Sequence, residues 1–154
     1  MKPKKSAGIL LYRKSKNVLE VFLVHPGGPF WKNKDEAAWS IPKGEFDENE
    51  EPLQAAIREF LEETGITVSG NFIELTPVIL KTGKKVFAWA LEKNIDANII
   101  VSNHFEMEWP PRSGKFQNFP EVDKGGWLTI DEAKKKINAM QFALIEELQK
   151  KLNS

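Results

Sequence analysis

Two apolar stretches near the start of the chain predict a pair of β-strands. They cover residues 6–12 (SAGILLY) and 18–24 (VLEVFLV), and both are rich in branched apolar side chains. The polar residues 13–17 between them favour a hairpin connection, although they include no glycine. Residues 25–37 contain two prolines and two glycines, so we expect a loop there, followed by a short extended piece over 39–42.

The clearest helix covers residues 53–64. Its apolar side chains recur every three or four positions and form one stripe: Leu53, Ala56, Ile57, Phe60 and Leu61. Pro52 suits the first turn of a helix, and Gly65 suits the position just past its end. We therefore expect one amphipathic helix with well-marked ends.

The rest of the chain predicts more strands and a helical end. Further strands are expected over 66–68, 72–80, 85–91 and 126–130, and helices over 131–138 and 139–152. Residues 93–120 are polar and without a clear period, and we expect them to be irregular. The order of strands, helix, strands and helix favours an α+β fold, an αβα sandwich with a mixed β-sheet and a C-terminal helix.

Length and composition narrow the class of protein. The 154 residues, with 41% apolar and 29% charged side chains, predict one globular domain over 1–154, with residues 1–5 frayed. The absence of cysteine excludes disulfides, zinc–thiolate sites and a cysteine nucleophile. The only histidines are His25 and His104, which excludes a three-histidine metal site.

The overall charge is balanced, and this bears on possible partners. Lysine and arginine number 22, as do aspartate and glutamate, so broad electrostatic binding of nucleic acid is not expected. No apolar stretch approaches the roughly 18 residues that a membrane helix needs. We expect a soluble, cytoplasmic protein without a membrane partner, and leave open whether it is a monomer or a homodimer.

The local charge is far from balanced. Eight acidic residues between positions 45 and 63 are opposed by one basic residue, Arg58. Glu59, Glu62 and Glu63 are spaced so that they project from the same side of the predicted helix, where like charges repel. Such a cluster becomes favourable if it holds a hard divalent cation, for which oxygen ligands suit Mg²⁺ or Mn²⁺. Arg58 could pair with Glu62 or reach back to Glu50.

The spacing of these residues resembles a known signature. Gly44, Glu50, Arg58-Glu59, Glu62-Glu63 and Gly65-Ile66 match the Nudix pattern G-x5-E-x7-R-E-U-x-E-E-x-G-U, with U apolar, at every defined position. The flanking strand pair, the WSIPKG segment and the closing helix extend the similarity over about 6–152. The resemblance implies an αβα sandwich in which the signature forms a loop–helix–loop. It also implies metal-dependent hydrolysis of a nucleoside diphosphate linked to another group.

The resemblance also implies roles for individual residues. Glu59, Glu62 and Glu63 would be the metal ligands, with the Lys43 carbonyl as a further one. Glu59 or a carboxylate outside the signature would act as the base, and Arg58 and Glu50 would form an orienting ion pair. Many family members place another carboxylate before a tryptophan-bearing strand. Glu121 and Asp123 compete for that role here, and Glu121 is preferred.

Four residues outside the acidic helix are candidates for binding substrate. Lys43 could contact a phosphate, Trp39 could stack on a base, His25 could line the cleft, and Arg112 could bind a distal phosphate. Each has a plainer alternative, as a surface lysine, a core tryptophan, a strand-closing histidine or a residue of a packed loop.

The substrate is less well marked than the reaction. The WSIPKG segment is similar to family members that act on dinucleoside polyphosphates, diphosphoinositol polyphosphates and some nucleoside triphosphates. Many ADP-ribose hydrolases carry a marker proline beyond the signature, and this chain lacks it there. The chain also lacks the tyrosine that marks some diadenosine polyphosphate hydrolases slightly further on. Phe87 or Trp89 could stack on a base instead of that tyrosine. We expect a dinucleoside polyphosphate, slightly ahead of a nucleoside triphosphate. Capped RNA is a weaker alternative, because the chain has no basic tract. A module that senses a nucleotide without cleaving it is also a weaker alternative, because all signature acids are present.

Overall fold

The computed structural model describes residues 4–153, and its first two strands form the predicted hairpin. Strand β1 (Lys5–Ser15) pairs antiparallel with β2 (Val18–Pro26). The turn consists of Lys16 and Asn17, both with positive φ, which closes the hairpin without glycine. Lys5 pairs with both Phe46 and Lys85, so the expectation that it is frayed was wrong; residues 1–3 lie outside the described residues.

A six-stranded mixed sheet is built around β1. The other strands are β3 (Lys43–Phe46), β4 (Ile73–Ile79), β5 (Lys85–Glu92) and β8 (Val122–Thr129). The order is β4-β5-β1-β2-β8, with β3 paired to one end of β1. Among the strand pairs of this sheet within residues 4–153, only β1–β5 is parallel. The expected α+β fold with a mixed sheet is confirmed.

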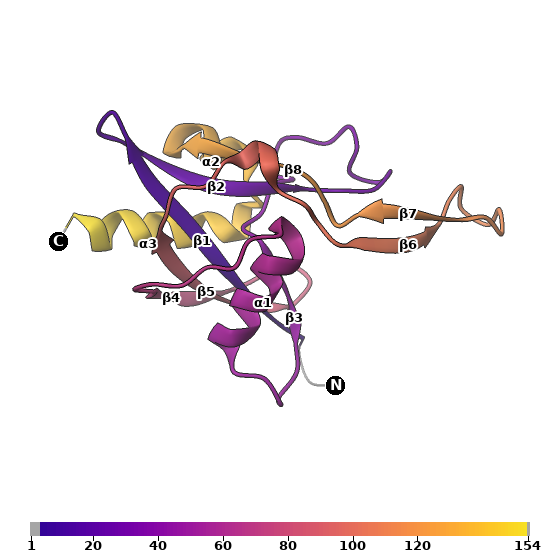
Figure 1. Ribbon diagram of the computed structural model, residues 1–154, viewed down its shortest axis with the longest axis horizontal. Helices are drawn as coiled ribbons and strands as arrows, with labels where there is room; N and C mark the ends of the chain where they lie inside the picture. The colour runs from indigo at the N-terminus through magenta and orange to yellow at the C-terminus, as the bar shows by residue number, and fades with distance from the viewer. Residues whose placement is uncertain (1–3, 154) are drawn as a thin grey trace.

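Helices cover both faces of this sheet. The helical elements are α1 (Pro52–Thr64), α2 (Ile130–Lys136) and α3 (Phe142–Leu152), with short 3₁₀ turns η1 (Ala97–Ile99) and η2 (Ala139–Gln141). Ile9 of β1 belongs to the apolar cluster beneath Phe60 of α1, whereas its neighbour Leu10 belongs to the cluster with Leu148 of α3. Because successive strand residues point to opposite faces, β1 is buried on both sides. Figure 1 shows the resulting layers.

The ends of the helices follow the predicted signals. Pro52 occupies the first turn of α1, and Gly65 ends it in the left-handed conformation, with its N–H donated to the Leu61 carbonyl. Thr129 caps α2 in a capping box with Glu132. The predicted helix over 139–152 is divided, because η2 precedes α3. Within residues 4–153 no helix has the length and apolar character needed to cross a membrane.

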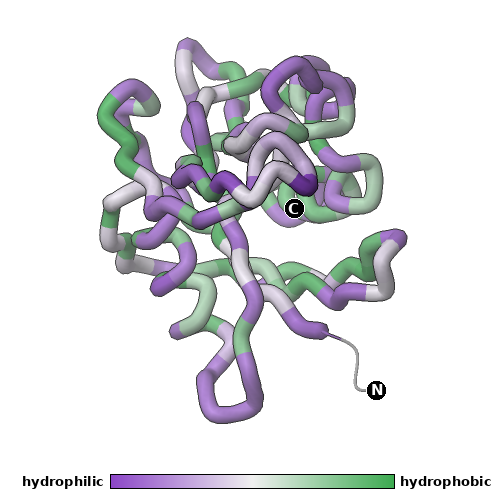
Figure 2. Tube along the Cα trace, turned by 90° about the vertical axis from the view of Figure 1, so that its right-hand side faces the viewer, coloured by the Kyte–Doolittle hydropathy of each residue, from purple (hydrophilic) through white to green (hydrophobic). Residues whose placement is uncertain are grey.

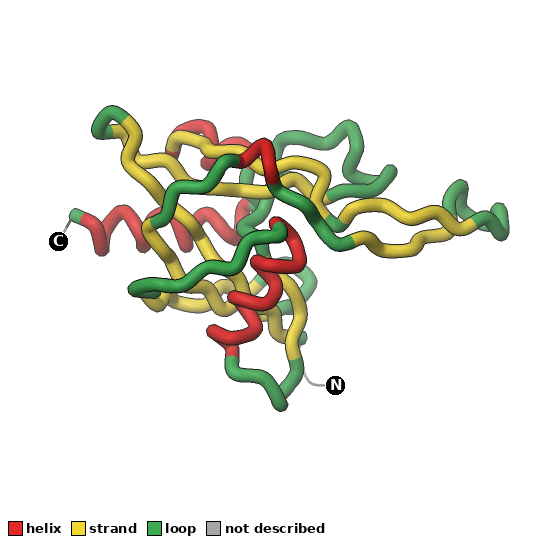
Figure 3. The backbone as a smooth tube through the Cα atoms, in the orientation of Figure 1, coloured by secondary structure: helices red, strands yellow, loops and turns green. Residues whose placement is uncertain are grey.

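Two segments differ from the sequence expectation. Residues 66–68 are not a strand. The stretch expected to be irregular contains an antiparallel hairpin of β6 (His104–Glu108) and β7 (Phe116–Pro120), which projects from the body of the molecule (Figures 1 and 3). Polar residues obscured it because most of this hairpin faces solvent. Figure 2 shows the loop before α1 as another hydrophilic excursion, at the bottom of the view.

Candidate active site

The acidic side of α1 lies against β3. Glu59 is only 8% exposed, and the absence of a side chain at Gly44 makes room for its carboxylate. A Cβ atom at Gly44 would lie 1.9–2.5 Å from the carboxyl atoms of Glu59. The backbone N–H of the neighbouring Lys43 donates to Oε1 of Glu63 over 3.3 Å. Strand β3 therefore leaves room for the carboxylate of Glu59 and donates a hydrogen bond to that of Glu63.

Arg58 organises the remaining acids. Its Nε and Nη2 donate to the two carboxylate oxygens of Glu50 over 2.7 and 2.8 Å, a two-pronged ion pair. Its Nη1 donates to Glu59 over 2.7 Å and to Glu62 over 3.2 Å. The two partners considered from sequence, Glu50 and Glu62, are thus both engaged. The Arg58 guanidinium, through its hydrogen bonds, holds the pKa of Glu50 below its ordinary value.

Burial and mutual repulsion disturb the ionisation of the carboxylates. Burial, together with neighbouring acids, raises the pKa of Glu59 to about 7 and that of Glu63 to about 8. Burial and the charge of Glu62 also raise the pKa of Glu121. Burial, with a smaller contribution from Lys84, lowers the pKa of Lys43. The ionised forms of Glu59, Glu63 and Glu121 are therefore disfavoured in the folded protein.

The carboxylates of α1 are suitable ligands for a divalent cation, but they are not yet arranged as a complete metal site. Buried carboxylate oxygens are the ligands that Mg²⁺ and Mn²⁺ prefer, and positive charge would offset their repulsion. In the part of the chain that the structure describes, no three acidic or histidine side chains already stand close enough to hold an ion. Arg58 instead bridges Glu59 and Glu62.

A small cavity brings residues from distant parts of the chain to this site. It has a volume of about 120 Å³, room for roughly four water molecules. Its lining residues are Val24, Pro26, Ser40, Ile41, Lys43, Glu63, Glu121 and Val122. We call it the polar pocket. Glu121, the single residue between β7 and β8, thereby meets Glu63 of α1.

His25 lies behind the wall of this pocket. It is 2% exposed, with Nδ1 2.9 Å from a carboxylate oxygen of Asp123 and Nε2 2.5 Å from the Lys34 carbonyl. The β2–β8 register shifts beside His25, so that Asp123 is an extra residue turned toward the imidazole. His25 therefore braces the loop after β2 instead of lining the cleft, and of the two competing acids only Glu121 reaches the polar pocket.

Trp39 and Arg112 also lie outside the lining of the polar pocket. Trp39 is 6% exposed, donates its Nε1–H to Asp35 and packs on the edge of His25, so it is a core residue and has no free face for a base. Arg112 lies in the loop at the outer end of the β6–β7 hairpin, which projects away from α1 (Figure 3). Arg112 is not among the residues that line the polar pocket.

The base of the hairpin is tied to the acidic helix through residues that sequence reasoning missed. The N–H groups of Val101 and Asn103 donate to the carbonyls of Thr64 and Glu62, over 2.8 and 2.7 Å. The N–H of Glu121 donates to the Asn103 carbonyl over 2.8 Å. These bonds satisfy carbonyls that a helix end leaves open, and they position Glu121 beside α1. Residues 101–103 carry no pattern that could have revealed this role.

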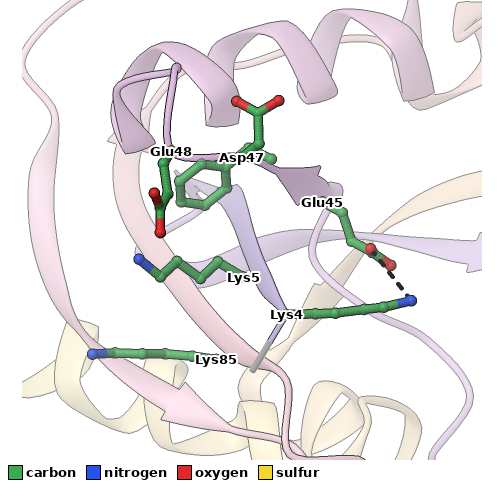
Figure 4. Close-up of a pocket in the computed structure, with 7 residues that line it drawn as sticks. Lys4, Lys5, Glu45, Asp47, Glu48 and Lys85 are labelled. Atoms are coloured by element: carbon green, nitrogen blue, oxygen red, sulfur yellow. Dashed lines mark ion pairs between the residues drawn. The ribbon is translucent and has the colours of Figure 1, made fainter. Parts of the chain in front are cut away.

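A larger cavity of about 520 Å³ lies at the end of β3 and the start of the loop that follows it (Figure 4). It is lined by Phe46 and by three lysines and three acids: Lys4, Lys5, Lys85, Glu45, Asp47 and Glu48. Figure 4 shows Lys5 and Lys85 extending to one side and Lys4 toward Glu45, at 3.8 Å. The lining charges balance, and Glu59, Glu62 and Glu63 are not among them. Of these two cavities, only the polar pocket is lined by an acid of α1, namely Glu63.

Several curated proteins are similar to parts of this chain. The rat asymmetrical bis(5'-nucleosyl)-tetraphosphatase is 38% identical over 117 residues, covering 71% of this chain and 64% of the relative. The RNA pyrophosphohydrolase of Bartonella henselae is 41% identical over 66 residues, covering 43% of this chain and 34% of the relative. The matched segments thus span less than two thirds of these relatives.

Solved structures share the fold over almost the whole chain. A Caenorhabditis elegans Ap4A hydrolase binary complex has a TM-score of 0.66 at 24% identity, covering 97% of this chain and 98% of that one. The NUDIX domain of Shewanella oneidensis NrtR, complexed with ADP ribose, has a TM-score of 0.67 at 17% identity, covering 99% and 90%. A family model described as NUDIX domain matches residues 2–148. With the signature placed on α1 and its flanking loops, the chain belongs to the Nudix family.

Proposed function

We propose that this protein hydrolyses a pyrophosphate bond of a nucleoside polyphosphate. The observation that carries the proposal is the convergence of Lys43, Glu63 and Glu121 on one small pocket, beside the other two acids of α1. A dinucleoside polyphosphate is the preferred substrate class and a nucleoside triphosphate the second. The similarity to the rat tetraphosphatase over 71% of the chain supports this order.

Mg²⁺ or Mn²⁺ is the proposed cofactor. Glu59, Glu62 and Glu63 would hold it, together with the Lys43 carbonyl. When bound, the ion neutralises charge on the phosphates and lowers the pKa of a bound water. The raised pKa values of Glu59 and Glu63 support this assignment, because a nearby cation would relieve the cost of burying both acids.

The remaining residues position the substrate and move a proton. The side chain of Lys43 supplies positive charge to a phosphate in the polar pocket. Glu121 accepts the proton of the attacking water, because Glu59 is already bound to Arg58 while Glu121 opens onto the pocket. Its raised pKa brings it closer to the working range of a general base. The Arg58–Glu50 ion pair fixes the start of the helix against the loop before it.

Removal of pyrophosphate from RNA is a further candidate, ranked below dinucleoside polyphosphates and nucleoside triphosphates. The Bartonella henselae RNA pyrophosphohydrolase is 41% identical over 66 residues, which favours including this substrate. The balanced charge of the chain does not favour it, since RNA binding draws on clustered basic residues.

A substrate panel tests the proposed function. Dinucleoside polyphosphates, nucleoside triphosphates, ADP-ribose, nucleotide sugars, diphosphoinositol polyphosphates and 5'-triphosphorylated RNA would be incubated with Mg²⁺ or Mn²⁺, and the products separated by charge. We expect turnover of a dinucleoside polyphosphate that a chelator abolishes. Glu62→Gln and Glu63→Gln should each lose most activity while staying folded. The control variant Glu146→Gln, on the exposed side of α3, should keep its activity. Near-normal rates in both site variants would refute the metal assignment, and silence across the panel would refute hydrolysis of these substrates.

A further inference from the structure

A second cavity adjoins the polar pocket, and its lining is of the opposite character. It has a volume of about 310 Å³ and is lined by Pro26, Gly27, Gly28, Phe30, Trp31, Phe105, Met107 and Glu121. Apart from Glu121 these residues are apolar, and three are aromatic. Pro26 and Glu121 line both cavities, so the two meet along these residues. We call the second cavity the hairpin pocket.

We propose that the hairpin pocket binds the nucleobase of the substrate, and that Phe30 and Phe105 are the residues that recognise it. The inference rests on the proposed function, because the polar pocket is taken to hold the phosphates joined to that base. A planar base has apolar faces that stack on aromatic side chains. The volume lies at the lower end of the range for ligand pockets, which suits a small planar group.

The first wall is the loop after β2, which packs directly against the β6–β7 hairpin. A Cβ atom at Gly27 would lie 2.0 Å from the Pro120 carbonyl oxygen, and one at Gly28 would lie 3.0 Å from Cζ of Phe105. Gly28 also has a φ of +94°. The Gly27 N–H donates to the Glu121 carbonyl over 2.9 Å. The glycine pair therefore allows the loop to contact the hairpin.

Phe30 is an exposed aromatic ring that is nevertheless held in place. Its side chain is 59% exposed, yet its ring meets Trp31 edge-on at 5.1 Å and Nζ of Lys34 lies 3.5 Å from its centre. His25 anchors the same loop through the Lys34 carbonyl. A ring that is already positioned loses little freedom when a ligand stacks on it.

The second wall is formed by the hairpin. Phe105 and Met107 are two residues apart on β6 and therefore share a face of the strand. Phe105 is backed by Phe119 of β7, with ring centres 6.1 Å apart. The chain on either side of the hairpin is bonded to α1 through Asn103. This wall is thus fixed relative to the acidic helix.

The aromatic residues considered earlier as base-stacking candidates do not compete for this role. Trp39 is 6% exposed and belongs to the core. Phe87 and Trp89 pack against the apolar cluster beneath α1. The hairpin pocket is the cavity that joins aromatic side chains to the polar pocket.

Ligand binding by variants tests this inference without requiring turnover. Adenosine 5'-monophosphate and, as a base-free probe, ribose 5-phosphate would be titrated by calorimetry in the presence of Mg²⁺. Phe30→Ala and Phe105→Ala remove the proposed stacking rings, and Phe30→Tyr keeps one. Phe116→Ala is the matched control, because Phe116 is 63% exposed on the same hairpin and does not line the pocket. Circular dichroism would verify that each variant is folded.

We expect Phe30→Ala and Phe105→Ala to bind adenosine 5'-monophosphate about 5- to 150-fold more weakly, the range for base–aromatic stacking. Phe30→Tyr and Phe116→Ala should match the wild type, and ribose 5-phosphate should bind all five proteins alike. Unchanged nucleotide affinity in both alanine variants would overturn the inference, as would wild-type binding of the nucleotide no tighter than that of the sugar phosphate. Phe30-dependent binding in a protein that cleaves nothing would support the pocket and refute only the proposed reaction.

Discussion

At the scale of single residues, Gly44 shows how closely the site is packed. Strand β3 passes so near to α1 that the Glu59 carboxylate occupies the place where a side chain of residue 44 would lie. Glu59 cannot simply turn away, because Nη1 of Arg58 is bonded to it over 2.7 Å. Glycine is needed at this position for the close approach of the Glu59 carboxylate, whereas Gly65 is needed for its backbone conformation.

Gly44→Ala should therefore reduce activity with little loss of fold. The added Cβ must displace the Glu59 carboxylate, and misplacing a catalytic group by about 1 Å can cost on the order of 100-fold in rate. Gly126→Ala is the matched control, since its Cβ would meet nothing nearer than 3.8 Å. Steady-state kinetics on both variants check this, and equal activities would contradict it.

At the scale of elements, the end of α1 is a junction. Gly65 ends the helix with a φ of 79°, and the last carbonyls accept bonds from residues 101 and 103. The Val101 carbonyl oxygen lies 3.1 Å from where a Cβ on Gly65 would be. The helix that carries the acids and the segment that carries Glu121 thus share one packed boundary, which explains how carboxylates far apart in sequence come together.

Gly65→Ala should destabilise the protein more than Gly83→Ala. Both glycines have positive φ, so each substitution costs about 1–2 kcal/mol in backbone strain. Gly83 has open space around it, whereas Gly65 has the Val101 backbone beside it. Urea unfolding measures the difference in the free energy of unfolding. Activity should fall only in Gly65→Ala, and equal losses of stability would argue against a packed junction.

At the scale of the whole molecule, the overall charge is balanced, but eight of the 22 acidic residues lie between positions 45 and 63. Lysine and arginine balance aspartate and glutamate overall, yet loss of solvent around the buried Glu59 and the half-buried Glu63 raises their pKa values from 4.5 to about 7 and about 8. Between pH 4.5 and 8 the folded protein therefore retains protons that the unfolded chain has released. Stability without metal must then fall as the pH rises through this window.

Unfolding measured across that pH range tests the electrostatics of the site. In the presence of a chelator, the free energy of unfolding should decrease from pH 5 to pH 8, by a few kcal/mol at most. Glu63→Gln should weaken this dependence, because it removes the acid with the higher pKa. Mg²⁺ should stabilise the protein increasingly toward pH 8, since it binds the ionised carboxylates. A metal-free stability that rises with pH over this range would contradict the predicted ionisation.

The acidic helix, its ends and most strands of the sheet could be predicted from local sequence patterns alone. These features repeat over a few residues, so the positions of Phe60, Glu59 and Glu62 on the helix follow from its 3.6-residue period, and the spacing of Gly44 and Arg58 indicated the family. Runs of branched apolar residues likewise located β1 and β2 without knowledge of their partners.

Which distant residues lie beside the acidic helix depends on the folded chain and could not be predicted from local patterns. In the folded chain, Glu121 lines the polar pocket whereas Asp123 contacts His25. His25 and Trp39 are buried, and the β6–β7 hairpin carries Phe105. Each of these outcomes depends on contacts between segments far apart in the chain, such as the bond from Asn103 to Glu62. A local pattern reports which face of an element is apolar, but burial and the meeting of side chains depend on what packs against that face.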